Sequence, residues 1–198
     1  MRTKKGEKEK LRLVILDKAI AFFKKHGRSG SASEDIMSYM NLTRGALYSH
    51  FKSKDDLFAK AVSHDLTRLE NLIEESIKLY GPMALRRNIE AHLSEKSLTD
   101  FENSCAFTSL ASDMQRCKAA HRAIYEEHMN RIYAIFAKAL HEQFPEDTPE
   151  QSHIKALNLY SGLVGTLSMA RTMKDREKAL EILESGRQFL ISQFTRVV

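Results

Sequence analysis

The chain has 198 residues, of which 42% are hydrophobic and 29% charged, a composition typical of a soluble globular protein and unlike that of a disordered chain. No apolar run is long enough for a membrane span, and the charged first ten residues do not resemble a signal peptide. The two cysteines, Cys105 and Cys117, are too few to predict a disulfide framework, so we expect a cytoplasmic protein with reduced thiols.

The positive charge is concentrated at the N-terminus. Residues 1–60 contain 14 Lys/Arg and 7 Asp/Glu, whereas residues 61–198 contain 17 and 19. A basic first third favours an N-terminal module that binds a polyanion, although a solvated basic surface would give the same count.

Helical periodicity accounts for nearly the whole chain. Only eight glycines and three prolines interrupt it, and no run alternates with period two for long enough to predict a strand. The sequence therefore predicts an all-α fold. At least the first few of residues 1–10 are expected to form a frayed arm. We expect helices over 11–26, 31–40, 43–51, 54–79, 83–96, 118–144, 148–172 and 177–194, a loop over 97–103, and an apolar segment of small residues over 101–114.

Several helix boundaries carry local signals. Gly27 is typical of a helix stop, and Ser31 with Glu34 fits a capping box that opens the second helix. Asn41 tolerates the left-handed turn conformation, and Thr43 can cap the third helix. Two short helices joined by such a turn have the size of a helix-turn-helix, with its second helix as the recognition helix.

The start of the third helix carries side chains suited to DNA. Thr43 can donate to a phosphate, Arg44 can bind a guanine edge, and Gly45 allows close approach to the DNA backbone. Tyr48 lies one turn further on the same face, and Lys52 and Lys54 flank the next helix start. Each residue also has a simpler interpretation: a core tyrosine, a packing role for His50, or solvated lysines.

The stretch "DKAIAFFKKHG", followed by "DIMSYMNLTRGALYSHFKSKDDLFAKAV", resembles the N-terminal domain of the TetR family of transcriptional repressors. The resemblance covers about residues 10–63 and departs from the family pattern at Ser31, Ser33 and Asn41. Arg44 and Ser49 occupy variable positions of the pattern, so the resemblance does not imply a base preference. The predicted DNA-binding residues are Ser31, Thr43, Arg44, Gly45, Tyr48, Ser49, His50, Lys52 and Lys54.

The resemblance implies two domains: a helix-turn-helix DNA-binding domain over 1–63 and a helical ligand-binding and dimerisation domain over 64–198. The aromatic and Met residues in the segments that would form an effector pocket are Phe101, Phe107, Met114, Tyr125, Met129, Tyr133 and Met169. The expected dimer interface contains Leu159, Gly162, Leu163, Thr166, Leu183, Phe189 and Leu190.

Neither a cofactor nor a metal site is expected. Cys117 and His121 share a helical face and could bind a transition metal, but no third ligand follows at motif spacing. Whether Cys105 or Cys117 senses oxidants stays open.

Together these features predict a sequence-specific, homodimeric regulator, most simply a repressor that binds an inverted-repeat operator in double-stranded DNA and is released by a small-molecule effector. A nonspecific nucleic-acid-binding protein is the alternative. A small helical hydrolase or transferase has no supporting motif, so we expect no enzyme.

Overall fold

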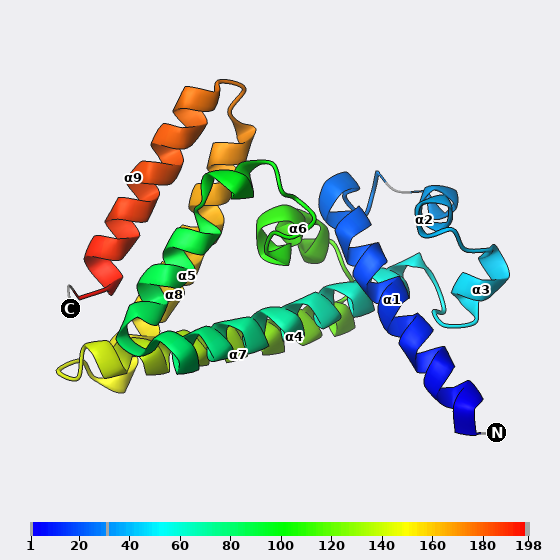
Figure 1. Cartoon of the computed structure of the whole chain (residues 1–198), viewed down its shortest axis with the longest axis horizontal. Helices are drawn as coiled ribbons and strands as arrows, with labels where there is room; N and C mark the ends of the chain where they lie inside the picture. Colours follow the sequence, from blue (N-terminus) through cyan, green and yellow to red (C-terminus); the bar gives the residue numbers. More distant parts are fainter. Residues whose placement is uncertain (1, 31, 197–198) are drawn as a thin grey trace. The chain divides into compact units, whose positions relative to one another are not determined.

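The computed structural model describes residues 2–30 and 32–196, and every regular element among them is a helix (Figure 1). The α-helices are α1 (Arg2–His26), α2 (Ser33–Met40), α3 (Arg44–Tyr48), α4 (Lys54–Tyr80), α5 (Ala84–His92), α6 (Ala106–Gln115), α7 (Ala119–Gln143), α8 (Pro149–Thr172) and α9 (Arg176–Phe194). Two short 3-10 helices, η1 (Gly81–Met83) and η2 (Glu95–Leu98), flank α5. The predicted all-α class is confirmed. None of the described helices is long and apolar enough to cross a membrane.

The chain divides into two compact units. Unit 1 contains the residues up to Thr67 together with Phe101–Tyr125, and unit 2 contains Arg68–Asp100 together with the residues from Glu126 onward. The first change of unit lies close to the predicted boundary after residue 63, but α6 and the start of α7 group with the N-terminal helices. The assignment of functions to 1–63 and 64–198 stays a prediction.

The core of unit 1 is built on the apolar face of α1. Phe23 is fully buried and meets the ring of Phe58 on α4 edge to face, with 5.0 Å between ring centroids. Ile36, Met40 and Leu47 from α2 and α3 are also buried. Burial of these side chains removes apolar surface from water and thereby fixes the two short helices on the longer ones.

The helix α1 begins at Arg2, so most of residues 1–10 are helical, whereas the helix was expected to begin at Leu11. This segment is highly charged, but it contains no proline and alternates basic with acidic residues. Arg12 pairs with Glu9 across 3.1 Å one turn earlier, a spacing that supports helices.

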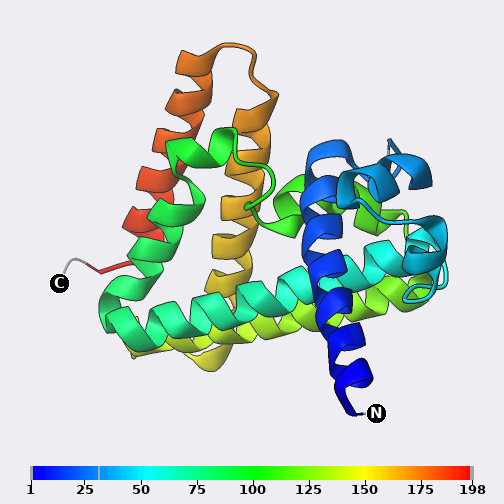
Figure 2. The ribbon, with the colours of Figure 1, turned by 45° about the vertical axis from the view of Figure 1, so that its right-hand side comes forward.

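In unit 2, α8 and α9 run antiparallel, side by side (Figure 2). Two glycines allow their close packing. A Cβ at Gly162 would lie 2.7 Å from Leu190 Cδ2, and a Cβ at Gly186 would lie 2.4 Å from Thr166 Cγ2. Both distances are shorter than real Cβ contacts, so these two glycines have a packing role within the chain.

Candidate nucleic-acid interface

The turn between α2 and α3 is held by local hydrogen bonds. Asn41 adopts φ 55° and ψ 47°, the left-handed conformation that was predicted for it. The Leu42 N–H donates to the Met37 carbonyl at 2.9 Å, which closes the end of α2. Thr43 caps α3 as predicted, since its hydroxyl accepts from the Ala46 N–H at 3.2 Å.

The start of α2 differs from the prediction. Its N-cap is Ala32, whose N–H donates to the Asp35 carboxylate at 3.2 Å. The acidic partner of this observed cap is Asp35, whereas the predicted capping box pairs Glu34 with Ser31. Ser31 itself, which was also predicted to contact DNA, lies outside the described residues.

One face of α3 is buried and the other faces solvent. Leu47 is 3% exposed and anchors the helix in the core, whereas Thr43, Arg44, Gly45, Tyr48 and Ser49 are exposed. The Arg44 guanidinium lies over the Tyr48 ring, 5.8 Å from its centroid. A Cβ at Gly45 would meet no atom within 4 Å, so the chain's own packing does not require glycine there.

His50 and the two lysines lie beside this face. His50 is half-buried; its burial and the charges of Lys8 and Arg12 lower the pKa of His50, so it is neutral at pH 7. Lys52 is exposed. The Lys54 ammonium donates to the Arg28 carbonyl at 3.0 Å, so a phosphate would have to share it through its other N–H groups.

The first turn of α4 is capped by its own side chains. Ser53 Oγ accepts from the Asp56 N–H at 3.1 Å, and Asp56 accepts from the Lys52 N–H at 2.9 Å. Burial acts to raise the pKa of Asp56, but the Lys52 N–H and the Lys60 ammonium outweigh it and lower that pKa. This carboxylate fixes the backbone at Lys52, next to the exposed face of α3.

Buried polar contacts hold the C-terminal end of α1, and sequence reasoning did not find them. Lys24 Nζ lies 2.7 Å from Asp65 Oδ2 on α4, with both side chains nearly inaccessible. After α1, the Arg28 N–H donates to Asp113 Oδ2 on α6 at 3.1 Å, and the Arg28 guanidinium pairs with Asp55 at 2.8 Å. These partners are 27 to 85 residues apart, so no local motif indicates them.

The residues predicted to line an effector pocket have diverse environments. In unit 1, Met114 and Tyr125 are buried, Phe107 is half-buried and Phe101 is exposed. The remaining three, in unit 2, are the half-buried Met129 and Tyr133 and the exposed Met169. Their role in binding a ligand stays a prediction.

Several of the predicted dimer-interface residues are buried within the single chain, and Gly162, Leu190 and Thr166 lie where α8 packs against α9. Leu159, Leu163, Leu183 and Leu190 are at most 3% exposed. Gly162 and Thr166 are half-buried, and Phe189 is 60% exposed. No group of three His, Cys, Asp or Glu side chains suited to a metal ion occurs in the part of the chain that the structure describes.

A buried helix-turn-helix core with a solvent-facing second helix is typical of DNA-binding transcriptional regulators. Residues 15–61 match the family model described as bacterial regulatory proteins, tetR family. The predicted resemblance to the TetR family is thus confirmed over these residues, which make up about a quarter of the chain.

Two curated relatives match parts of the chain. The chain is 34% identical over 101 residues to the HTH-type transcriptional regulator AcrR of Shigella flexneri, covering 50% of this chain and 47% of AcrR. It is 27% identical to the biofilm operon icaADBC negative transcriptional regulator IcaR of Staphylococcus epidermidis, covering 43% of this chain and 62% of IcaR. These matches span between about half and three-fifths of the relatives' own lengths.

The fold is similar to a TetR-family regulator from Agrobacterium tumefaciens, with TM-score 0.80, 19% identity and coverage of 96% and 100% of the two chains. FadR from Bacillus subtilis in complex with stearoyl-CoA gives TM-score 0.70 at 17% identity, covering 91% of this chain and 97% of FadR.

Proposed function

We propose that this regulator is a homodimeric repressor that binds an inverted-repeat operator in double-stranded DNA and is released by a small-molecule effector. The exposed face of α3 carries the proposal. Arg44 supplies a fork of donors for a guanine edge, and Tyr48 supplies a hydroxyl for a phosphate. Because a Cβ at Gly45 would meet no atom within 4 Å among the described residues, the missing side chain leaves room for close approach of a partner such as DNA.

Dimerisation is supported by an uncharged exposed stripe on α8. Five exposed residues at helical spacing form this stripe: Ile154, Asn158, Ser161, Gly165 and Met169. Glycine inside a helix costs about 1 kcal/mol relative to alanine. Gly162 has a packing reason for that cost, but a Cβ at Gly165 would meet no atom within 4 Å. Packing of α8 against α8 of a second copy would explain a glycine at position 165, since small residues allow helices to approach closely.

The direction of regulation is inferred from relatives. IcaR is a negative regulator, and FadR binds an acyl-CoA in its solved structure. By analogy, we expect an effector that binds one arrangement of the dimer more tightly than another. The ratio of its affinities for the two arrangements sets how far it can change the affinity for DNA. Two recognition helices can enter successive major grooves when they lie roughly 34–36 Å apart or a multiple of that distance.

Selection of duplexes from a random-sequence pool by the purified protein tests the proposal. We expect an inverted-repeat consensus, and we expect Arg44→Ala to lose preference at one position of each half-site. Arg122→Ala, which removes an exposed arginine on α7, is the matched control and should keep the consensus. Recovery of unrelated duplexes with equal affinity at matched salt would favour a nonspecific nucleic-acid-binding protein.

Light scattering with size-exclusion chromatography tests the dimer. We expect twice the chain mass for the natural protein and a shift to the monomer for Gly165→Arg. Ala134→Arg adds the same charge at an exposed position of α7 and should remain dimeric. A monomeric natural protein, or a Gly165→Arg variant as dimeric as the control, would contradict the proposed interface.

A further inference from the structure

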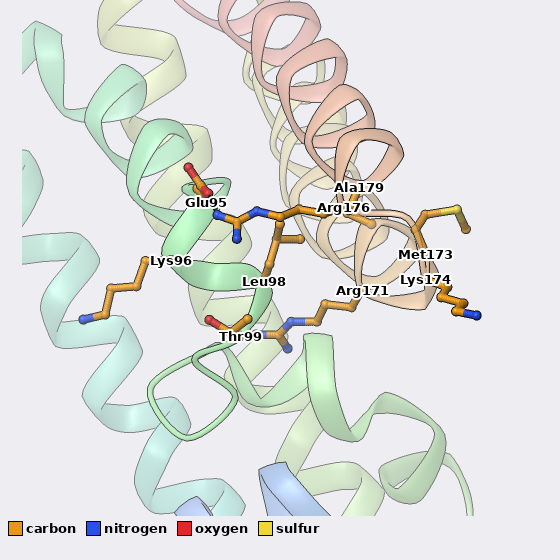
Figure 3. A pocket seen from close by; sticks show the side chains of 10 residues that line it. Glu95, Lys96, Leu98, Thr99, Arg171, Met173, Lys174, Arg176 and Ala179 are labelled. Carbon is orange, nitrogen blue, oxygen red and sulfur yellow. Dashed lines mark hydrogen bonds and ion pairs between the residues drawn. The ribbon is translucent and has the colours of Figure 1, made fainter.

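A cavity of about 540 Å³ lies in unit 2 between η2 and the turn that joins α8 to α9 (Figure 3). Its wall contains four cationic side chains and a single carboxylate among the described lining residues. The charged residues are Lys96, Arg171, Lys174, Arg176 and Glu95. Apolar surface between them comes from Leu98, Ala170, Met173 and Ala179. None of the seven predicted effector residues is among the described residues that line it.

Arg171 is held in place by the backbone of η2 and the segment after it. Its Nε and Nη2 donate to the Ser97 carbonyl at 3.0 and 2.6 Å, and Nη2 lies 3.4 Å from the Asp100 carbonyl. A guanidinium that is already ordered loses little side-chain entropy when it binds an anion. In Figure 3 it reaches from α8 towards η2, below Leu98.

Arg176 lies on the other side of Leu98 and forms an ion pair with Glu95 (Figure 3). That pair is exposed on both sides, with side-chain exposures of 76% and 56%, so it is held weakly and Arg176 can turn to another anion. The Lys174 ammonium forms no ion pair or hydrogen bond with the residues that the structure describes. Lys96 is 3.5 Å from Asp100.

The pKa of His92, which lies near Arg171, is sensitive to the charge of that arginine. Its burial, and then the charge of Arg171, lower the pKa of His92 to about 4. It is therefore neutral at pH 7, and it adds a polar but uncharged group beside the cations. A solvated basic surface would explain Lys96 and Lys174, and capping of η2 would explain Arg171, but neither explains why the Arg171 and Arg176 side chains lie on either side of Leu98 in the wall of one cavity (Figure 3).

We propose that this cavity binds an organic anion whose carboxylate or phosphate head lies between Arg171 and Arg176 and whose short apolar body covers Leu98. Planar guanidinium groups bind both head groups through paired N–H donors. The volume lies within the roughly 300–1,000 Å³ typical of small-molecule sites. Binding of the anion does not depend on the proposed function; the further step, that the anion changes operator affinity, rests on it.

Isothermal titration calorimetry on the full chain without DNA tests the binding step. The probes are octanoate and octyl phosphate, with 1-octanol as the uncharged control of equal chain length. We expect both anions to bind in the natural protein and 1-octanol to bind at least tenfold more weakly. The relative affinities of the two anions identify the preferred head group.

The test variant is Lys174→Gln/Arg176→Gln, which removes two charges from exposed side chains and leaves the structural contacts of Arg171 intact. We expect roughly fivefold weaker anion binding for each charge removed, hence about 25-fold in the double variant. Lys138→Gln neutralises an exposed lysine of α7 outside the cavity and should bind as the natural protein does. Circular dichroism establishes that each variant is folded.

Three results would each overturn the site. They are failure of both octanoate and octyl phosphate to bind, binding of 1-octanol as tightly as the anions, and anion binding by the folded double variant as tight as by the natural protein. Operator binding is then measured separately by fluorescence anisotropy with and without the tighter anion. A protein that binds DNA but no anion refutes this inference and leaves the proposed function standing. A protein that binds anions but no specific DNA refutes the proposed function and leaves the site standing.

Discussion

The buried ion pair between Lys24 and Asp65 gives the sharpest test of how α1 is held in unit 1. Lys24 Nζ and Asp65 Oδ2 are 2.7 Å apart, with side-chain exposures of 1% and 5%. Lys24→Met keeps most of the apolar stem but leaves the Asp65 carboxylate buried without the ammonium. Removing one partner of a buried pair typically destabilises a protein by about 3–5 kcal/mol.

Urea unfolding followed by circular dichroism measures this loss in the free energy of unfolding, and thermal unfolding measures it as a lower melting temperature. For a chain of this length, about 1 kcal/mol corresponds to roughly 2–4 °C in the melting temperature, so we expect the variant to melt about 6–20 °C lower. The double variant Lys24→Met/Asp65→Leu removes both charges and should recover most of the stability, because well-packed apolar pairs can replace buried ion pairs.

The adjacent Lys25 is a matched control. Its ammonium is 3.9 Å from Glu102, and both side chains are about half exposed, at 57% and 43%. Lys25→Met should therefore change stability by less than about 1 kcal/mol. If Lys24→Met were as stable as Lys25→Met, the reasoning that the buried pair fixes α1 on α4 would be refuted.

Three further expectations follow from other contacts. Folding lowers the pKa of His92 from 6.5 to about 4, so the unfolded state binds more protons between these values. Stability should therefore fall as pH drops from about 6.5 to about 4, by at most about 3 kcal/mol, and His92→Gln should flatten that part of the profile in urea unfolding. Gly186→Ala should lower the melting temperature by overpacking against Thr166, and Thr166→Ala in the same chain should relieve it; additive effects would exclude the contact. Lys52→Ala should weaken binding to all duplexes and reduce the salt slope by about one without changing stability, whereas Lys54→Ala should also lower the melting temperature because it loses its bond to the segment after α1. Equal melting temperatures for these two lysine variants would contradict a structural role for Lys54.

Features set by neighbouring residues could be predicted from the sequence. The cap at Thr43, the left-handed Asn41 and the start of α8 at Pro149 depend on side chains within three residues of each other. Thr148 and Gln151 exchange hydrogen bonds of 3.2 and 2.7 Å, a reciprocal cap that a local pattern can indicate. The exposed face of α3 follows from the helical spacing of its residues around the buried Leu47.

Features that depend on distant residues could not be predicted. Asp113 is as ordinary in sequence as any helical aspartate, and its bond to the Arg28 N–H appears only when α6 packs beside α1. The basic cavity collects Glu95–Thr99 and Ala170–Ala179, which are about seventy residues apart, so no motif spacing indicates it. Likewise, periodicity indicates that Leu159 and Leu190 are apolar helix positions but not whether their partner is the same chain or a second copy.

The contacts around Arg28 suggest how a change in unit 2 could reach the proposed DNA-binding face. The first twelve residues of α4 hold α1 through Asp65, and they hold the segment after α1 at Arg28 through Lys54 and Asp55. The same helix continues past Thr67 into unit 2, and α7 likewise continues from Tyr125 to Glu126. Two of the three places where the chain passes between the units therefore lie inside continuous helices, which resist local bending. A shift of α4 would act on the contacts that position the end of α1, and α1 packs on α2 through the rings of Phe22 and Tyr39. This continuity makes α4 the element through which effector release of DNA, as proposed above, would act.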